Sequence, residues 1–226
     1  MAFIYMHDFL PYLWYEACFW VSGPAMTLGF SLRTEGMRHV PRTGPALLIA
    51  NHQSFFDPDL VGLAARRHLR FLARKSLFRH KLFAWLIRSL QAVPIDHEGI
   101  GIDGIRDILD QLQAGRAVLV FPEGERTYDG KMSPLRAGVS LLIKRSQAPV
   151  VPVGIAGAYE TWPRQRGFPI PAPLFLPEQL GTIAVSIGRP LDGRQLAELP
   201  REKLLADLFD ELKKAHDRAE RLRKRK

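Results

Sequence analysis

The fold is decided between residues 45 and 58, which read Pro-Ala-Leu-Leu-Ile-Ala-Asn-His-Gln-Ser-Phe-Phe-Asp-Pro. The first half is an apolar run behind a Gly44-Pro45 turn, which predicts a short buried strand. The stretch ends with Asp57 and Pro58. Aspartate is a residue type that caps helices, and proline is favoured at the first helical position. The stretch therefore predicts a buried strand that leads through a polar loop into a helix capped by Asp57.

The same alternation continues toward the C-terminus. Apolar runs predict strands at 69–73, 92–95, 117–121, 150–155 and 182–187, and helical spacing predicts helices at 57–67, 77–90, 102–114, 135–145 and 201–223. Strands that alternate with helices indicate an α/β fold with a mostly parallel central sheet flanked by helices. In such folds, ligands bind beyond the carboxyl ends of the strands.

Length and composition bound the number of domains and the class of protein. The 226 residues fit one α/β domain, which we place at 33–226, preceded by a distinct segment at 1–32. With 46% hydrophobic and 24% charged residues, the chain is neither disordered nor collagen-like. The single cysteine, Cys18, excludes a disulfide within the chain and a cysteine-rich metal site, and it suits a location facing the cytosol.

The chain is strongly basic, and its charge is unevenly placed. A net charge of +9 favours phosphates, nucleic acid or an anionic membrane as partners. From Leu60 to Ile95 there is no acidic residue, whereas eight Lys or Arg residues lie there. A basic cluster at 218–226 is either a solvated tail or a contact for anionic lipid.

Aromatic residues crowd the first 20 positions, which hold eight of the chain's 22. Amphipathic aromatic rings are typical of the boundary between lipid headgroups and acyl chains. A span needs about 20 uninterrupted apolar residues. Here Glu16 lies inside the segment, and we expect Gly23-Pro24 to break it. We therefore predict an N-terminal membrane-associated helical segment that lies on the membrane; a packed hairpin and a true span are the alternatives.

The first polar loop, residues 51–57, offers a histidine and an aspartate. His52 and Asp57 are five residues apart, which a loop can bring together although one helix face cannot. A carboxylate bonded to one ring nitrogen leaves the other nitrogen free to accept a proton. Alone this is weak evidence, because a lone histidine is often structural and Asp57 already has an explanation as a helix cap.

The second polar loop, residues 121–127, follows the clearest predicted strand. Glu123 offers a carboxylate, Gly124 permits a tight turn, and Arg126 carries a fork of donors suited to phosphate oxygens. A charged surface loop with an internal ion pair is the alternative. Because both loops follow strands of a parallel sheet, we expect them at one edge.

Together, the two loops resemble sequence blocks of the glycerolipid acyltransferases, the family typified by lysophosphatidic acid acyltransferase. Residues 51–57 match its first block, Asn-His-x-Ser-x-x-Asp, in which four residues separate His from Asp. Residues 121–127 match its third block, Phe-Pro-Glu-Gly-x-Arg-Ser, with Thr127 for the serine. Val151-Pro152-Val153 matches the fourth block, and order and spacing agree from about Gly36 to Gly188.

The family's second block is only half present. Lys75 stands before Ser-Leu-Phe, as the family's basic residue near Leu-Phe does. Residues 91–97 then lack the family's glycine and its closing arginine, and His97 stands where that arginine is expected. In relatives the arginine helps to hold the phosphate of the acyl acceptor. The departure therefore bears on the acceptor more than on the reaction.

The resemblance implies an O-acyltransferase of phospholipid biosynthesis at the cytoplasmic face of a membrane. His52 would act as general base toward the hydroxyl of a lysophospholipid, with lysophosphatidic acid favoured, and Asp57 would steady the imidazolium. The donor would be acyl-CoA or acyl carrier protein, with no further cofactor and no metal. The residues implied to bind the acceptor are Lys75, Glu123, Gly124, Arg126, Arg136 and His97.

Three alternatives stay open. The acceptor could be another lysolipid or lack a phosphate. A non-catalytic module that binds anionic lipid or nucleic acid is the alternative from another class, although we expect no nucleic acid partner because no predicted helix carries a base-reading face. Hydrolysis of a thioester or lipid is the competing enzyme class, but the chain has no Gly-x-Ser-x-Gly turn.

Overall fold

The strands form a seven-stranded sheet in the order β1-β7-β6-β2-β5-β3-β4. The computed structural model describes residues 2–95, 102–174 and 182–224. The strands are β1 (Arg33–Glu35), β2 (Ala46–Ala50), β3 (Leu69–Arg74), β4 (Ala92–Ile95), β5 (Ala117–Val120), β6 (Val150–Ala156) and β7 (Ala184–Ile187). β6 and β7 pair antiparallel, and the other neighbouring pairs are parallel. The predicted α/β class with a mostly parallel sheet is confirmed.

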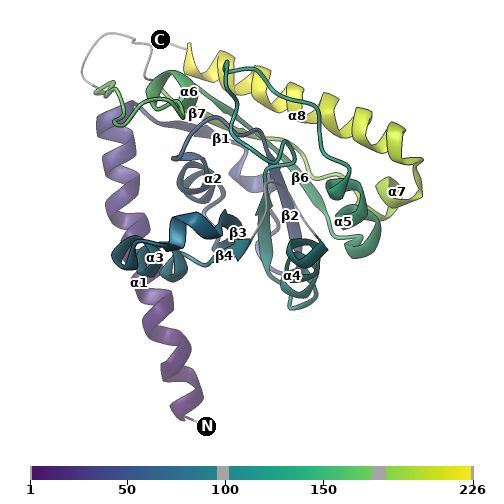
Figure 1. Cartoon of the computed structure of the whole chain (residues 1–226), viewed down its shortest axis with the longest axis horizontal. Coiled ribbons are helices and arrows are strands. Elements are labelled where there is room, and N and C mark those ends of the chain that lie inside the picture. Colours follow the sequence, from purple (N-terminus) through teal and green to yellow (C-terminus); the bar gives the residue numbers. More distant parts are fainter. Residues whose placement is uncertain (1, 96–101, 175–181, 225–226) are drawn as a thin grey trace.

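Helices cover both faces of the sheet (Figure 1). The α-helices are α1 (Ala2–Phe30), α2 (Asp57–Ala65), α3 (Lys81–Ser89), α4 (Ile102–Gln113), α5 (Gly138–Ser146), α6 (Ala158–Thr161), α7 (Gly193–Glu198) and α8 (Arg201–Arg223). Short 3₁₀ turns are η1 (Met37–His39) and η2 (Lys75–Phe78). α1, α2 and α3 lie on one face, and α4, α5 and α8 lie on the other.

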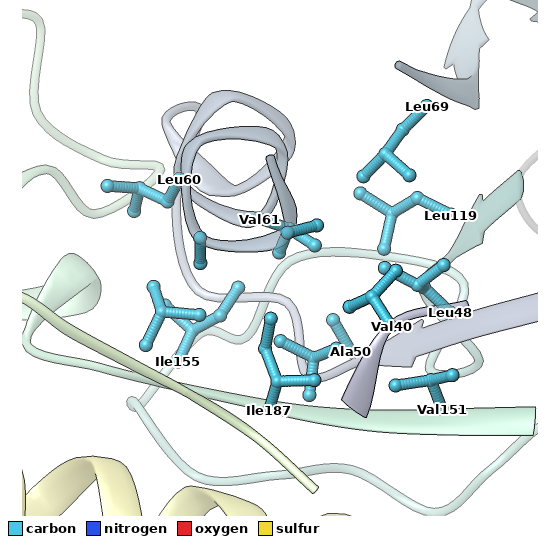
Figure 2. Close-up of a cluster of buried hydrophobic side chains, with 14 of the residues drawn as sticks. Val40, Leu48, Ala50, Leu60, Val61, Leu69, Leu119, Val151, Ile155 and Ile187 are labelled. Carbon is cyan, nitrogen blue, oxygen red and sulfur yellow. The ribbon is translucent and has the colours of Figure 1, made fainter. Parts of the chain in front are cut away.

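β2 is held between two hydrophobic clusters because successive side chains of a strand point to opposite faces. Leu48 and Ala50 belong to the same buried cluster as Leu60 of α2 (Figure 2). Leu47 and Ile49 pack into the cluster under α4, α5 and α8. All five side chains have no exposed surface. The loop that follows β2 is thereby fixed to the centre of the sheet.

β6 is pressed close to α8, and it also anchors the loop after β2. A Cβ at Gly154 would lie 2.1 Å from the backbone nitrogen of His216, so this approach requires glycine. The next residue, Ile155, exchanges two hydrogen bonds with Asn51: its N–H donates to Oδ1 at 2.8 Å, and its carbonyl accepts from Nδ2 at 2.9 Å. Asn51 therefore fastens the first polar loop to its neighbouring strand.

α1 is one continuous helix of 29 residues, so the expected break at Gly23-Pro24 is wrong. Packing on the domain holds the helix on both sides of the proline. Tyr15 is 4% exposed and Met26 8%. Of the helices in the described part of the chain, none is long and apolar enough to cross a membrane. The membrane-associated role of residues 1–32 and the domain boundary there stay predictions.

Most predicted elements are present with shifted ends. The helix expected at 57–67 ends at Ala65 because Arg66 adopts the left-handed conformation, with φ 45°. The helix expected at 77–90 divides into η2 and α3. β1 was not predicted, since its Arg-Thr-Glu sequence contains no apolar run.

Candidate active site

The loop between β2 and α2 brings His52 and Asp57 into contact. Nδ1 of His52 lies 2.7 Å from Oδ2 of Asp57, whose side chain is fully buried. Because a carboxylate only accepts, Nδ1 carries the proton of the neutral imidazole and Nε2 is the accepting nitrogen. The same Oδ2 accepts the backbone N–H groups of Gln53 at 2.6 Å and Ser54 at 2.8 Å. The loop thus closes around one carboxylate, which orients the imidazole.

Asp57 does not cap α2, which corrects the prediction from its sequence position. α2 begins at Asp57 itself, with Phe56 at the N-cap position and no side-chain cap. The carboxylate instead turns back to residues 52–54, where it holds the histidine and the two backbone N–H groups. Pro58 is the second residue of the helix, one position later than predicted. Helix capping therefore does not explain this aspartate.

Glu123 ties the second loop to the first. Its Oε1 accepts the backbone N–H of His52 at 2.8 Å, and its Oε2 accepts that of Ser133 at 2.6 Å. The backbone N–H of Thr127 donates to the carbonyl of His52 at 2.9 Å. Glu123 is 3% exposed, and burial raises its pKa to about 7, although the two N–H donors act to lower it. The carboxyl of Glu123 thus accepts a backbone N–H of the first loop and that of Ser133, which follows the second loop.

A cavity of about 290 Å³ lies between the two loops and the end of β3. His52 lines it and stacks on Phe121, with ring centroids 4.0 Å apart. The Arg126 guanidinium lies 3.4 Å from the centre of the Phe55 ring. Its buried Nη1 has no hydrogen-bond partner among the described residues. Burial and the nearby Arg164 lower the pKa of Arg126 to about 10, which leaves it charged at neutral pH.

Of the remaining predicted site residues, the structure describes Gly124, Arg136 and Lys75. Gly124 lines the cavity with φ 82°, and a Cβ there would lie 2.4 Å from Nε of Arg136. Arg136 donates from Nε to the Glu123 carbonyl at 3.0 Å. Lys75 is exposed at the start of η2, directly after β3. Neither Arg136 nor Lys75 is among the described residues that line the cavity. His97 lies outside the described residues.

Three residues that the sequence did not single out also shape the site. Arg74, the last residue of β3, lines the cavity, as does Phe55. The sequence did offer a signal for Arg74, because this residue directly follows the strand predicted at 69–73 and precedes Lys75. Arg164 donates to Glu125 Oε2 at 3.2 Å and to the carbonyl of Arg126 at 3.3 Å. It lies 38 residues beyond Arg126, so no local pattern marks it.

Comparison with known families matches residues 31–156, more than half of the chain, to the Acyltransferase family. The match includes both loops and the strands that carry them. This chain belongs to the Acyltransferase family. Its membership confirms the resemblance seen in the two loops, and it places the cavity between His52 and Arg126 inside the family's own region.

Relatives of this family member occur in bacteria and plants. It is 24% identical to the 1-acyl-sn-glycerol-3-phosphate acyltransferase of Bacillus subtilis, over 83% of this chain and 87% of that protein. For the enzyme of the same name from Streptococcus pneumoniae the identity is 29%, over 49% of this chain and 41% of that protein. The chloroplastic 1-acyl-sn-glycerol-3-phosphate acyltransferase of Brassica napus is 25% identical, over 57% of this chain and 38% of that protein. The chain thus spans less than half the length of the last two relatives.

A solved structure supports the fold of this acyltransferase-family chain. The crystal structure of the 1-acyl-sn-glycerophosphate acyltransferase from Thermotoga maritima matches with a TM-score of 0.69 and 25% identity, over 86% of this chain and 73% of that one. Within the described residues, no cluster of three His, Cys, Asp or Glu side chains is arranged to hold a metal ion.

Proposed function

We propose that this chain transfers a fatty acyl group from a thioester to the free hydroxyl of a lysophospholipid. The observation that carries the proposal is the 2.7 Å pairing of His52 with buried Asp57 at a cavity that also contains the Arg126 guanidinium. The pair supplies a base, and the guanidinium supplies a site for a phosphate. The names of the relatives favour lysophosphatidic acid as acceptor and phosphatidic acid as product.

The reaction needs only one proton carrier. Nε2 of His52 takes the proton of the acceptor hydroxyl while its oxygen bonds to the thioester carbonyl carbon, and Asp57 stabilises the imidazolium. The tetrahedral intermediate then breaks its C–S bond, and the departing thiolate receives the proton from His52. An ester and a free thiol result without an acyl-enzyme. General-base catalysis of this kind contributes roughly 10² to 10⁴-fold.

The donors for the developing oxyanion must be groups other than the backbone N–H groups of residues 52–54. The backbone N–H groups of His52, Gln53 and Ser54 are already bonded to the carboxylates of Glu123 and Asp57. These N–H groups therefore hold the base in place. Stabilisation of the oxyanion falls to other donors at the cavity.

The acceptor and donor meet at a membrane surface in this proposal. The exposed face of α1 carries Trp20 and Val21, which are 78% and 73% exposed. The end of α1 reaches the first loop, where the rings of Phe30 and Phe56 lie 5.2 Å apart. A helix bound to the cytoplasmic face would therefore bring the cavity close to lysolipid in the membrane. Acyl-CoA or acyl carrier protein would supply the acyl group, with no other cofactor.

A panel of acceptors tests the function. Protein is incubated with acyl-CoA or acyl carrier protein and with lysophosphatidic acid, other lysophospholipids or monoacylglycerol; products are identified by mass spectrometry and released thiol is measured. We expect phosphatidic acid and thiol in equal amounts, and only when the acceptor is present. Thioester consumed without acceptor would indicate a hydrolase and contradict the proposal.

The phosphate contact is tested by Arg126→Gln against Arg194→Gln, an exposed arginine of α7 that provides a charge-matched control. A charge-assisted hydrogen bond contributes about 1.5 to 3 kcal/mol, so we expect Arg126→Gln to raise KM for lysophosphatidic acid by about 10 to 100-fold. The control should leave KM unchanged. Equal KM values for both variants would remove Arg126 from acceptor binding.

A further inference from the structure

A second, strongly basic hollow lies at the opposite edge of the sheet from the candidate active site. Its walls come from α1, from the turn after α2, and from the amino ends of β3 and β5, and its volume is about 460 Å³. Its basic side chains are Arg42, Arg66, Arg67, His68, Arg70 and Arg116. The active-site cavity lies at the carboxyl ends of the same strands, so the two are separate.

Most of this positive charge has no acidic partner. Glu16 is the acidic residue that lines the hollow, and it pairs with His68 at 2.8 Å. Within the described part of the chain, Arg66, Arg70 and Arg116 make no ion pair. The Nε atom of Arg70 is buried and also lacks a hydrogen-bond partner among the described residues. Guanidinium groups gathered without a counter-charge form a site that an anion would stabilise.

Two of the basic side chains, those of Arg67 and His68, are held by contacts within the protein. The Arg67 guanidinium donates to the backbone carbonyls of Pro41 and Gly44. These hydrogen bonds join the end of α2 to the segment before β2. His68 is held between Glu16 and the ring of Tyr15, whose centroid lies 4.0 Å from that of the imidazole. Arg67 and His68 are therefore structural. Arg116 donates from Nη1 to Gln111 Oε1 at 2.6 Å, and its other N–H groups, with those of Arg66 and Arg70, are left to face a ligand.

A groove of about 410 Å³, polar where it meets the hollow and largely apolar beyond, continues from the hollow along α1. Phe19, Trp20 and Leu63 line it. The groove and the hollow share Glu16, Arg66, Arg67 and His68. A ligand that fills both must carry an anionic group at one end and an apolar body at the other, which is the chemistry of a phospholipid.

We propose that the hollow and groove form an accessory site for a phospholipid of the membrane, with its phosphate against Arg66, Arg70 and Arg116 and an acyl chain along α1. α1 passes from the hollow at Glu16 to the active-site loop at Phe30, about 21 Å at 1.5 Å per residue. A lipid held at one end of this length keeps α1 on the membrane surface. The active-site edge is thereby placed at the same surface.

The test removes two of these charges. Arg70→Gln/Arg116→Gln is compared with Arg194→Gln/Arg201→Gln, which removes the same charge from exposed positions on α7 and α8. Sedimentation with phosphatidylcholine vesicles that contain about one third phosphatidylglycerol measures binding. Each basic residue at an anionic surface is worth roughly fivefold, so we expect the first variant to bind at least about tenfold more weakly. The control should change binding less than about threefold.

A second variant guards against a folding defect, because Arg70 is partly buried. Arg42→Gln/Arg66→Gln changes two exposed residues of the hollow and should weaken binding in the same direction. Binding to vesicles of phosphatidylcholine alone should be equal for all proteins. Equal losses in the hollow and control variants would show that only total charge matters and would overturn the site.

A phosphate group could come from a lipid or from a soluble ligand, and inorganic phosphate is used to distinguish the two. It is titrated into the vesicle assay at constant ionic strength, and its direct binding is measured by calorimetry. Tight phosphate binding that Arg70→Gln/Arg116→Gln abolishes, with vesicle binding unchanged, would assign the hollow to a soluble phosphate and overturn the lipid assignment. Turnover of a short-chain, water-soluble acceptor without vesicles should match wild type in every variant, so failure of the proposed activity is seen separately from failure of this site.

Discussion

At the scale of single residues, the charge of Asp57 is the clearest target. In Asp57→Asn, the side-chain oxygen still accepts the N–H groups of Gln53 and Ser54 but offers no negative charge to an imidazolium. We expect turnover to fall by about 10² to 10⁴-fold and the free energy of unfolding by less than about 2 kcal/mol. Steady-state kinetics and urea unfolding measure the two effects. Activity within tenfold of wild type would contradict the role of Asp57.

Glu123 should make stability depend on pH. Burial raises its pKa to about 7 in the native protein, whereas glutamate in an unfolded chain titrates near 4.3. Between about pH 4.5 and 7 the unfolded chain has lost this proton while the native protein keeps it, so the free energy of unfolding falls as pH rises. Relative to Glu123→Gln, wild type should lose about 3 kcal/mol across this window. Urea unfolding at several pH values measures the difference, and parallel curves would exclude a raised pKa.

The sequence could predict which residues meet at the site better than what each does there. The spacing of His52 and Asp57 after a strand allowed the contact that the structure contains. The hydrogen bond from the backbone N–H of His52 to Glu123 was not predictable, because the two residues are 71 positions apart. Nothing in the local sequence shows that the Glu123 carboxyl is buried. The capping expected of Asp57 was wrong because three nearer groups compete for its carboxylate.

At the scale of elements, α1 has a buried face and an exposed face. Trp20→Ser/Val21→Ser changes exposed side chains, so we expect weaker vesicle binding with stability within about 0.5 kcal/mol of wild type. Tyr15→Ala, on the buried face, should lower the free energy of unfolding by about 3 to 5 kcal/mol. Vesicle sedimentation and thermal unfolding separate the two. Unchanged vesicle binding by the first variant would contradict membrane contact through this face.

Deletion of residues 1–32 would be a less informative experiment. It would remove Tyr15 and Met26, which are buried against the domain, together with the exposed face. A loss of binding would then not be distinguishable from a loss of folding. Substitutions confined to one face avoid this ambiguity.

The elements themselves were predictable to different degrees. Buried strands such as β2 and β5 are continuous apolar runs, and these strands were predicted with ends that shift by one residue. β1 was not predicted because it is a strand only through its pairing with β7, which is distant in sequence. Gly23-Pro24 failed as a helix stop because the side chains on either side pack on the domain, which outweighs local preference.

At the scale of the whole molecule, the basic charge divides between the two edges of the sheet. Arg126 and Arg74 line the cavity at the carboxyl edge, and Arg70 and Arg116 line the hollow at the amino edge. α1 passes beside both edges, so one helix on the membrane would present both to lipid. The fold could be anticipated from alternating strands and helices. The separation of charge could not, because it follows from strand direction in the assembled sheet.

The proposed reaction depends on His52 as the base. His52→Asn retains a donor close to the position of Nδ1 for Asp57 but has no Nε2, so it removes the base while keeping the loop bonded. The decisive measurement is the turnover of this variant with acyl-CoA and lysophosphatidic acid, with thermal unfolding as the check on folding. We expect turnover to fall by at least about 10²-fold while the variant remains folded. A folded His52→Asn protein that retains more than about a tenth of wild-type turnover would contradict this role of His52.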